Sequence, residues 1–454
     1  MQARFCWITH AGRDALPRAV HNAGMALSTK TAGFPAARPS RPIPVTSLQP
    51  SVWRGRLGVN AFTWGTLFCC LILQRFAIPA GALKISVATP LVLGLAAWAL
   101  ASGTLVIERR RMALYCGLCA VALFSVATQI NLPLAMAPRM SLTSLYYWLA
   151  ITAFAVLRFR HSVSETAFFR LVSLAMAALA VAGLVQFVLQ FVGVSFFSFA
   201  GVVPDQFLIE EQYNVTIPID RGLNKSNGFF LVEPSVFSQF MAVGVVVEAL
   251  YFRRTAFLAL FFTGLLSSMS GTGWMVVGSY IVVLAISAGR RGLLGAILLA
   301  AGCALAFAAL SIVLPDFADM MSGRMYEFTL PGTSGHERFV TPFLALQDLL
   351  NAAPWVSVTG VGPGASEKLM IPYVYQLNTP VKVLMEYGIF GLTLYLGLLI
   401  WGTRTKRQAT LLVPLMVLLL LTGGYHQFSP ILFAVLLIGT VAYVHQDEVP
   451  VKWA

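Results

Sequence analysis

The chain has few charged residues. Only 11% of its 454 residues are Asp, Glu, Lys or Arg, whereas 58% are hydrophobic. A soluble domain carries roughly 25% charged residues, so this composition excludes a soluble globular fold. Apolar stretches near the ~20 residues needed to span a bilayer recur along the chain. The sequence therefore predicts a polytopic membrane protein.

Cysteine is scarce as well, and clusters of metal-ligating residues are missing from the sequence. The chain has six cysteines, and none of them lies in a long polar loop. No disulfide framework is predicted, and Cys116 and Cys119, despite their C-x-x-C spacing, are interpreted as small packing residues in an apolar helix. No His and Asp residues have metal-ligand spacing. We expect neither a metal nor any other cofactor.

Long apolar runs are abundant. They predict an all-α fold with about twelve transmembrane helices, at 58–75, 85–107, 113–130, 142–157, 167–193, 234–252, 255–269, 273–288, 293–314, 388–403, 409–424 and 429–445. Basic residues gather at alternate junctions, near 109–111, 158–160, 253–254, 290–291 and 404–407. The positive-inside rule places these junctions, and with them both termini, in the cytoplasm. The net charge of +13 then requires no nucleic acid partner.

The apolar segments divide the chain into six parts. These are a disordered basic tail, the N-terminal helices, a first outer loop, the central helices, a large outer loop, and the C-terminal helices with a short cytoplasmic tail, over residues 1–57, 58–193, 194–233, 234–314, 315–387 and 388–454. Both outer loops exceed the ~12–15 residues of plain connections, which indicates function. Apolar residues at helical spacing within 336–353 predict an amphipathic helix on the outer membrane surface. No predicted span carries an ionisable residue near its centre, which argues against an ion-coupled transporter.

Three polar motifs lie on the outer side of the predicted membrane. The first is RGLNKSNGFFLVEPS at 221–235, and the second is SMSGTGWMVVG at 268–278. The third is the large loop, with GHERF at 335–339, TGVGPGAS at 359–366 and QLNTPVKVLMEYGIFGLTLYL at 376–396. Several arginines accompany them, and the planar fork of arginine suits a pyrophosphate. The glycines of 360–364 either bring backbone N–H groups to an anion or form a plain turn. Gly271 and Gly273 are interpreted as a turn between two short helices.

The order of these motifs among many spans resembles the O-antigen polymerase and O-antigen ligase-like superfamily. These bacterial inner-membrane enzymes act on sugar chains attached to undecaprenyl pyrophosphate. The resemblance runs from about Gln190 to the C-terminus and is strongest to the polymerases of capsule and exopolysaccharide systems. A family pattern of His-Asn, then Glu, then Gly-x-x-Gly corresponds here to Leu377, Asn378, Glu386, Gly388 and Gly391. Ligases carry a histidine where this chain has leucine, which argues against a ligase.

The resemblance implies a polytopic, GT-C-like glycosyltransferase that polymerises lipid-linked repeat units on the periplasmic face. The enzyme would invert the anomeric centre, use no metal, and take undecaprenyl-pyrophosphate-linked glycans as substrates. Its partners would be inner-membrane lipid and a chain-length regulator and a flippase of the same pathway. The alternatives are a ligase that transfers finished chains, a flippase for lipid-linked oligosaccharides, and a membrane scaffold.

The expected catalytic residues are Glu233, Arg338, Arg221, Glu337 and His336. Both arginines would contact the pyrophosphate, and Glu233 would act as the base or bind the acceptor hydroxyl. His336 and Glu337 are alternative bases. Glu233 has a plain alternative role beside the dipole of the helix that follows it, and the arginines in surface salt bridges. The expected substrate contacts are Lys225, Gly228, Arg324, Gly362, Tyr373, Asn378 and Glu386, the last of which has helix capping as its alternative.

Overall fold

The computed structural model describes residues 50–80, 83–131, 134, 136, 140–160, 163–197, 199, 202–209, 223–313, 326, 328–370, 376–401, 406–423 and 428–441. All of them belong to one compact unit, Gln49–Ala454. Three of the expected site residues, Arg221, Arg324 and Tyr373, lie outside the described residues, as does most of the predicted tail 1–57.

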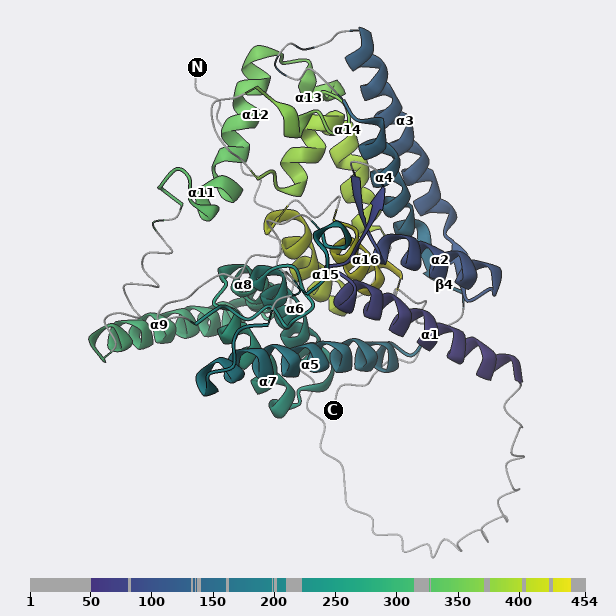
Figure 1. The fold of residues 1–454 in the computed structure, drawn as a ribbon. Coiled ribbons are helices and arrows are strands. Elements are labelled where there is room, and N and C mark those ends of the chain that lie inside the picture. Colours follow the sequence, from purple (N-terminus) through teal and green to yellow (C-terminus); the bar gives the residue numbers. More distant parts are fainter. Residues whose placement is uncertain are drawn as a thin grey trace, which may run out of the picture. The chain divides into compact units, whose positions relative to one another are not determined.

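Helices make up 75% of the structure, and strands are few (Figure 1). Each predicted apolar segment overlaps one helix, namely α1 (Pro50–Ile72), α2 (Ala88–Ala101), α3 (Arg109–Asn131), α4 (Leu142–Thr152), α5 (Glu165–Leu189), α6 (Pro234–Val247), α7 (Thr255–Ser268), α8 (Gly271–Ser287), α9 (Gly289–Val313), α14 (Thr379–Ile400), α15 (Lys406–Met416) and α16 (Ser429–Leu436). The large outer loop adds α11 (Ser334–Phe339), α12 (Thr341–Ala352) and α13 (Val356–Thr359).

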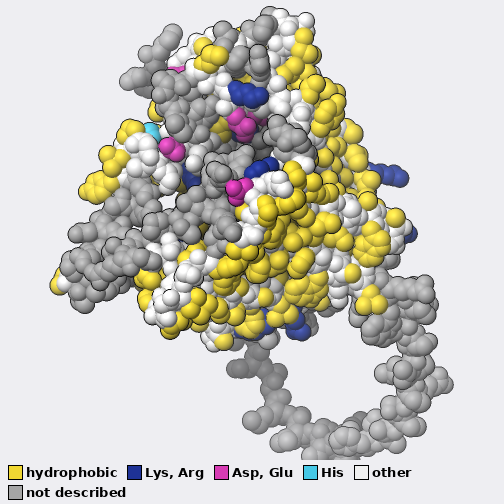
Figure 2. All heavy atoms as spheres, in the orientation of Figure 1, with side chains coloured by type: hydrophobic (Ala, Val, Ile, Leu, Met, Phe, Trp, Pro, Cys, Tyr) yellow, Lys and Arg dark blue, Asp and Glu magenta, His cyan; other side chains and the backbone are white. Residues whose placement is uncertain are grey.

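Among the described residues, four helices are long and apolar enough to cross a membrane. They are Arg109–Asn131, Glu165–Val192, Pro234–Phe252 and Thr379–Ile400. The remaining apolar helices have 10–17 residues, so a total of twelve spans stays a prediction. Figure 2 shows broad hydrophobic areas on the surface, with charged side chains gathered between them. The helices indicate a membrane protein.

Two small antiparallel sheets depart from the all-α prediction. Strand β1 (Ala77–Ala80) pairs with β2 (Leu83–Ser86), and β3 (Leu105–Ile107) pairs with β4 (Leu157–Phe159). The segment 85–107, predicted as one helix, therefore contains a strand at each end, because hydropathy alone does not separate a helix from a short apolar strand. Gly103, at φ 72, provides the left-handed turn between α2 and β3.

Helix α6 lies at the centre of the main hydrophobic core. All of its residues are buried against α5, α7 and α8. Close packing depends on a missing side chain at Gly183, since a Cβ there would overlap the ring of Phe237. Small residues of this kind let helices approach closely in membranes, where burial of apolar surface does not drive helices together. A second, smaller core joins α12 and α13 to α14.

The large outer loop differs from its predicted form in two respects. The single helix predicted over 336–353 is divided at Val340 into α11 and α12, because Pro342 starts a new helix rather than continuing one. Helix α14 begins at Thr379 rather than at 388, with the Asn378 side chain accepting the Val381 N–H at its start. Asn378 is thus a helix cap in the structure.

Helix α14 also carries two ionisable residues that the predicted span 388–403 did not include. Lys382 and Glu386 lie within this apolar helix, and both are buried. The helix is broken at Gly388, where φ is 68° and ψ is −173°. A broken apolar helix with buried ionisable groups is a feature of membrane transporters, so it bears on the choice of function below.

Candidate functional site

The two ends of α6 carry different charged groups. Glu233 precedes the helix as its N-cap residue, with Pro234 at the first helical position. Proline favours this position because its fixed φ suits the first turn and no N–H is needed there. At the other end, the helix continues as a π-helical turn, Glu248–Phe252. The sequence thus places Glu233 at the N-terminus of a buried apolar helix.

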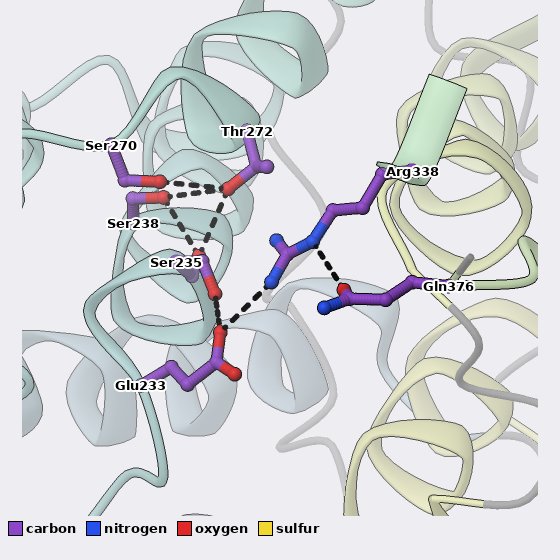
Figure 3. Close-up of polar contacts among 7 residues, drawn as sticks. All are labelled: Glu233, Ser235, Ser238, Ser270, Thr272, Arg338 and Gln376. Carbon is purple, nitrogen blue, oxygen red and sulfur yellow. Dashed lines mark hydrogen bonds and ion pairs between the residues drawn. The ribbon is translucent and has the colours of Figure 1, made fainter. Parts of the chain in front are cut away.

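Glu233 meets Arg338, a residue 105 positions further along the chain (Figure 3). Its Oε2 accepts a hydrogen bond from Ser235 Oγ at 2.6 Å and lies 3.5 Å from Arg338 Nη2. Each side chain of this ion pair is 20% exposed. Arg338 Nε in turn donates to Gln376 Oε1 at 2.8 Å. The two segments predicted as outer loops therefore converge on one polar site, formed by α6, α11 and the segment before α14.

His336 and Glu337 directly precede Arg338, and the contacts that the structure gives them are not with Glu233. His336 Nδ1 lies 3.0 Å from Thr341 Oγ1 at the junction of α11 and α12. The backbone carbonyl of Glu337 accepts the Gln376 N–H at 2.9 Å. Both residues thus help to fix α11, which carries Arg338, and the neighbouring Gln376. Of the four expected catalytic residues that the structure describes, Glu233 and Arg338 are the two that it joins directly.

A group of hydroxyls beside Glu233 was missed by the sequence analysis. Ser238 Oγ and Thr272 Oγ1 both donate to the Ser235 carbonyl, at 2.8 and 3.2 Å, and Ser270 Oγ lies 3.1 Å from Thr272 Oγ1 (Figure 3). These contacts join the first turn of α6 to the first turn of α8. The signal was the pair of serines three residues apart after Glu233, facing one side of a helix.

Gly273 has a packing role that the turn interpretation did not include. Its N–H donates to Ser238 Oγ at 3.1 Å, and a Cβ on it would lie 2.5 Å from the Ser238 carbonyl oxygen. Gly271, by contrast, has no atom within 4 Å of such a Cβ. Gly273 therefore lets α8 contact α6 backbone to backbone beside the site.

Lys225 and Gly228 are buried within the segment that leads to Glu233. The neighbouring Ser226 and Asn227 are bound to Gln186 of α5, whose Oε1 accepts the Asn227 N–H at 3.1 Å. Gly228 has φ 68°, and a Cβ on it would lie 3.0 Å from the Phe237 ring. The observed contacts of Gly228 are thus with the protein core.

The TGVGPGAS motif crosses α14 at its break. The N–H groups of Val361 and Gly362 donate to the carbonyls of Met385 and Glu386, at 2.8 and 3.1 Å. These two N–H groups are therefore engaged with the protein rather than free for an anion. A Cβ on Gly360 would overlap the Glu386 carbonyl, and one on Gly388 would overlap the Val358 carbonyl. Gly360 of the TGVGPGAS motif and Gly388 of the Gly-x-x-Gly motif therefore lie where the two backbones cross.

Glu386 belongs to a second polar group, inside the protein. Its Oε1 accepts a hydrogen bond from Ser366 Oγ at 2.5 Å and lies 3.9 Å from Lys382 Nζ. Lys382 also forms an ion pair with Glu367, which is exposed. This group fastens the crossing loop to α14 and neutralises charges that are costly to bury alone.

The fold and the site together define a class: a mostly helical membrane protein with a carboxylate–guanidinium pair at one end of a buried apolar helix. No protein-family model and no curated protein matches the chain.

Proposed function

We propose that this protein is a membrane glycosyltransferase that polymerises lipid-pyrophosphate-linked repeat units into exopolysaccharide, capsule or O-antigen. It would act on the periplasmic face of a bacterial inner membrane, with both termini in the cytoplasm. The observation that carries the proposal is the convergence of Glu233 and Arg338 from two separate loops. The motifs that hold them are those on which the family resemblance rests.

The pair supplies the two groups that such a transfer needs. An acceptor hydroxyl attacks the anomeric carbon of the growing chain, its proton passes to the Glu233 carboxylate, and the bond to the pyrophosphate oxygen breaks. The pyrophosphate leaves with the bonding electrons, and the Arg338 guanidinium stabilises the charge that develops on it. General-base catalysis of this kind contributes about 10²–10⁴-fold.

The geometry of the resting pair suits an exchange of partners. The 3.5 Å separation of Arg338 Nη2 and Glu233 Oε2 is longer than the ~2.7–2.9 Å of a strong charge-assisted hydrogen bond. Both groups also reach solvent. An incoming phosphate can therefore draw Arg338 away, while Ser235 and the backbone retain Glu233.

The position of the site relative to the basic residues supports an outer active site. The helix Pro234–Phe252 has 19 residues, or about 28 Å, close to the ~30 Å of a hydrocarbon core. Glu233 precedes one end, whereas Arg254 and Arg407 contact residues at the other. By the positive-inside rule, the end with the arginines would face the cytoplasm.

Of the alternatives, the ligase and the flippase differ in their support. Leu377, at the position of the ligase histidine, packs in the second hydrophobic core with Val381 and Met385, where it has no chemistry to offer. A flippase for the same lipid-linked oligosaccharides is the second candidate, because Lys382 and Glu386 lie buried in a broken apolar helix.

The test is polymer length in cells that carry Glu233→Gln or Arg338→Ala at matched membrane abundance. Arg170→Ala, at an exposed arginine of α5, is the control and should leave polymer unchanged. Loss of long polymer with single lipid-linked repeats collecting on the outer face supports the polymerase. Repeats that collect on the inner face indicate the flippase, and unchanged polymer would show that the site is elsewhere.

A further inference from the structure

We infer that Arg75, together with Gln74, is a positioning residue that holds the backbone before Glu233 so that its carboxylate faces Arg338. The expected effect on catalysis rests on the proposed function, whereas the expected effect on the position of Glu233 does not. Neither residue belongs to the polar motifs, and both lie in the turn between α1 and β1, far from Glu233 in sequence.

Three hydrogen bonds join this dipeptide to the two residues that precede Glu233. The Arg75 guanidinium donates to the Leu231 carbonyl at 2.7 Å and to the Val232 carbonyl at 3.3 Å. Gln74 Oε1 accepts the Val232 N–H at 3.1 Å. Leu231 and Val232 are buried, and their backbone groups need partners because unpaired polar groups are costly away from water.

The dipeptide is itself fixed to neighbouring segments. Gln74 Nε2 donates to the Cys70 carbonyl in the last turns of α1, at 3.2 Å. The Arg75 carbonyl accepts the Ile209 N–H at 2.9 Å, and Phe76 forms a β-bridge with Leu208. A support attached on several sides can hold the extended backbone at Glu233 in one place.

Arg75 keeps its charge in this buried position. It is 1% exposed, and an arginine guanidinium stays protonated at neutral pH even when it is buried. Hydrogen bonds from a charged donor are stronger than those from a neutral one. The cation thus fixes the carbonyls more firmly than a neutral amide would.

Arg111 provides a matched control. It is also 1% exposed and also donates to backbone carbonyls, to Leu157 at 3.2 Å and Trp401 at 3.0 Å. These carbonyls lie among the basic residues rather than beside Glu233. Arg111 also pairs with Glu108, 3.0 Å away, so its loss gives an upper limit for the cost of removing a buried arginine away from Glu233.

The first experiment measures geometry without activity. In the full-length protein in lipid nanodiscs, with its native cysteines replaced by alanine, Glu233→Cys and Arg338→Cys are crosslinked with a short bis-methanethiosulfonate. We expect Arg75→Gln to slow crosslinking about tenfold and Gln74→Leu to slow it less, whereas Arg111→Gln leaves it within about twofold. An unchanged rate in Arg75→Gln, or an equal fall in Arg111→Gln, would overturn the inference.

The second experiment separates this inference from the proposed function. With purified lipid-linked repeats as substrate, Arg75→Gln should lower kcat about tenfold with little change in KM, and Arg75→Lys should restore part of it. If Glu233→Gln abolishes polymer and Arg75→Gln does not affect kcat, the positioning role is wrong. If crosslinking responds to Arg75 but neither variant changes polymer formation, the proposed function is wrong and the positioning role stands.

Discussion

Two ion pairs stand near the two ends of α6, and they are built differently. Glu248 and Arg254 are six residues apart; Glu248 is 0% exposed, and Ser173 Oγ donates to the same carboxylate. The Arg254 guanidinium also stacks on Phe257, 3.8 Å from the ring centroid. Glu233 and Arg338 come from distant segments, and both reach solvent.

The contrast separates a structural pair from one that is available to a ligand. The carboxylate of Glu248 is enclosed by its partners, so that pair can only hold α5, α6 and α7 together. The carboxylate of Glu233 has one hydroxyl donor and one distant arginine, so its surroundings can rearrange. A half-buried pair at 3.5 Å that reaches solvent contributes little stability, so its placement favours a role in binding a ligand.

The largest expected difference between the two pairs is in activity. Glu233→Gln should reduce polymer formation by about 10²–10⁴-fold, because the amide cannot accept the acceptor proton. The folded fraction should stay the same. Initial rates per folded protein in nanodiscs would measure this, with Arg170→Ala as the control. Residual activity above about one tenth would mean that Glu233 is not the base.

The free energy of unfolding should show the opposite order, with a larger loss at Glu248 than at Glu233. Glu248→Ala leaves Arg254 partly buried without its carboxylate and should cost about 2–3 kcal/mol, somewhat below the value for a fully buried pair because Arg254 reaches solvent. Glu233→Ala should cost under about 1 kcal/mol. Thermal unfolding in detergent compares the two variants directly. Equal losses would remove the distinction between the pairs.

The close packing of α8 on α6 should matter at the site end. Gly273→Ala forces a methyl group toward the Ser238 carbonyl and should destabilise the protein by about 1–3 kcal/mol. Gly278→Ala, further along α8 and with open space around it, should be neutral or slightly stabilising. Unfolding midpoints of both variants test this, and similar values would argue against close contact at Gly273.

The smallest expected effect is the coupling between Glu233 and Arg338. A double-mutant cycle on stability should give about 0.2–1 kcal/mol for this pair, and the value should fall between 0.1 and 1 M salt as screening increases. The enclosed Glu248–Arg254 pair should respond less to salt. A large, salt-independent coupling at Glu233 would indicate a closed structural pair there too.

Hydropathy was enough to locate the apolar helices but not their ends. Helix α14 was expected to start at 388 because Lys382 and Glu386 made its first turns look like a loop. Lys382 is paired with Glu367, and Glu386 accepts a hydrogen bond from Ser366. Both partners come from another segment, and no local pattern reports them. The strands of 85–107 were missed because short apolar strands and helices share one composition.

The site was recognised as residues but not as an arrangement. Glu233 and Arg338 stood in separate motifs, and their convergence depends on tertiary packing that the sequence does not display. Gln74 and Arg75 drew no notice, because a polar dipeptide at the end of an apolar helix is ordinarily explained by contact with the membrane surface. The TGVGPGAS glycines had two readings, and the crossing with Gly388 shows their packing role.

The separation of the partners along the chain also sets the order in which the two pairs can form during synthesis. Ser173, Glu248 and Arg254 are all made within one stretch of the chain, so the Glu248 charge has its partners as soon as synthesis has passed Arg254. Arg338 is made about a hundred residues later, and Gln376 later still. A ribosome that has finished the central helices has therefore made all of the Glu248 pair but only half of the Glu233 pair, and whatever the second pair does must wait for the last third of the protein.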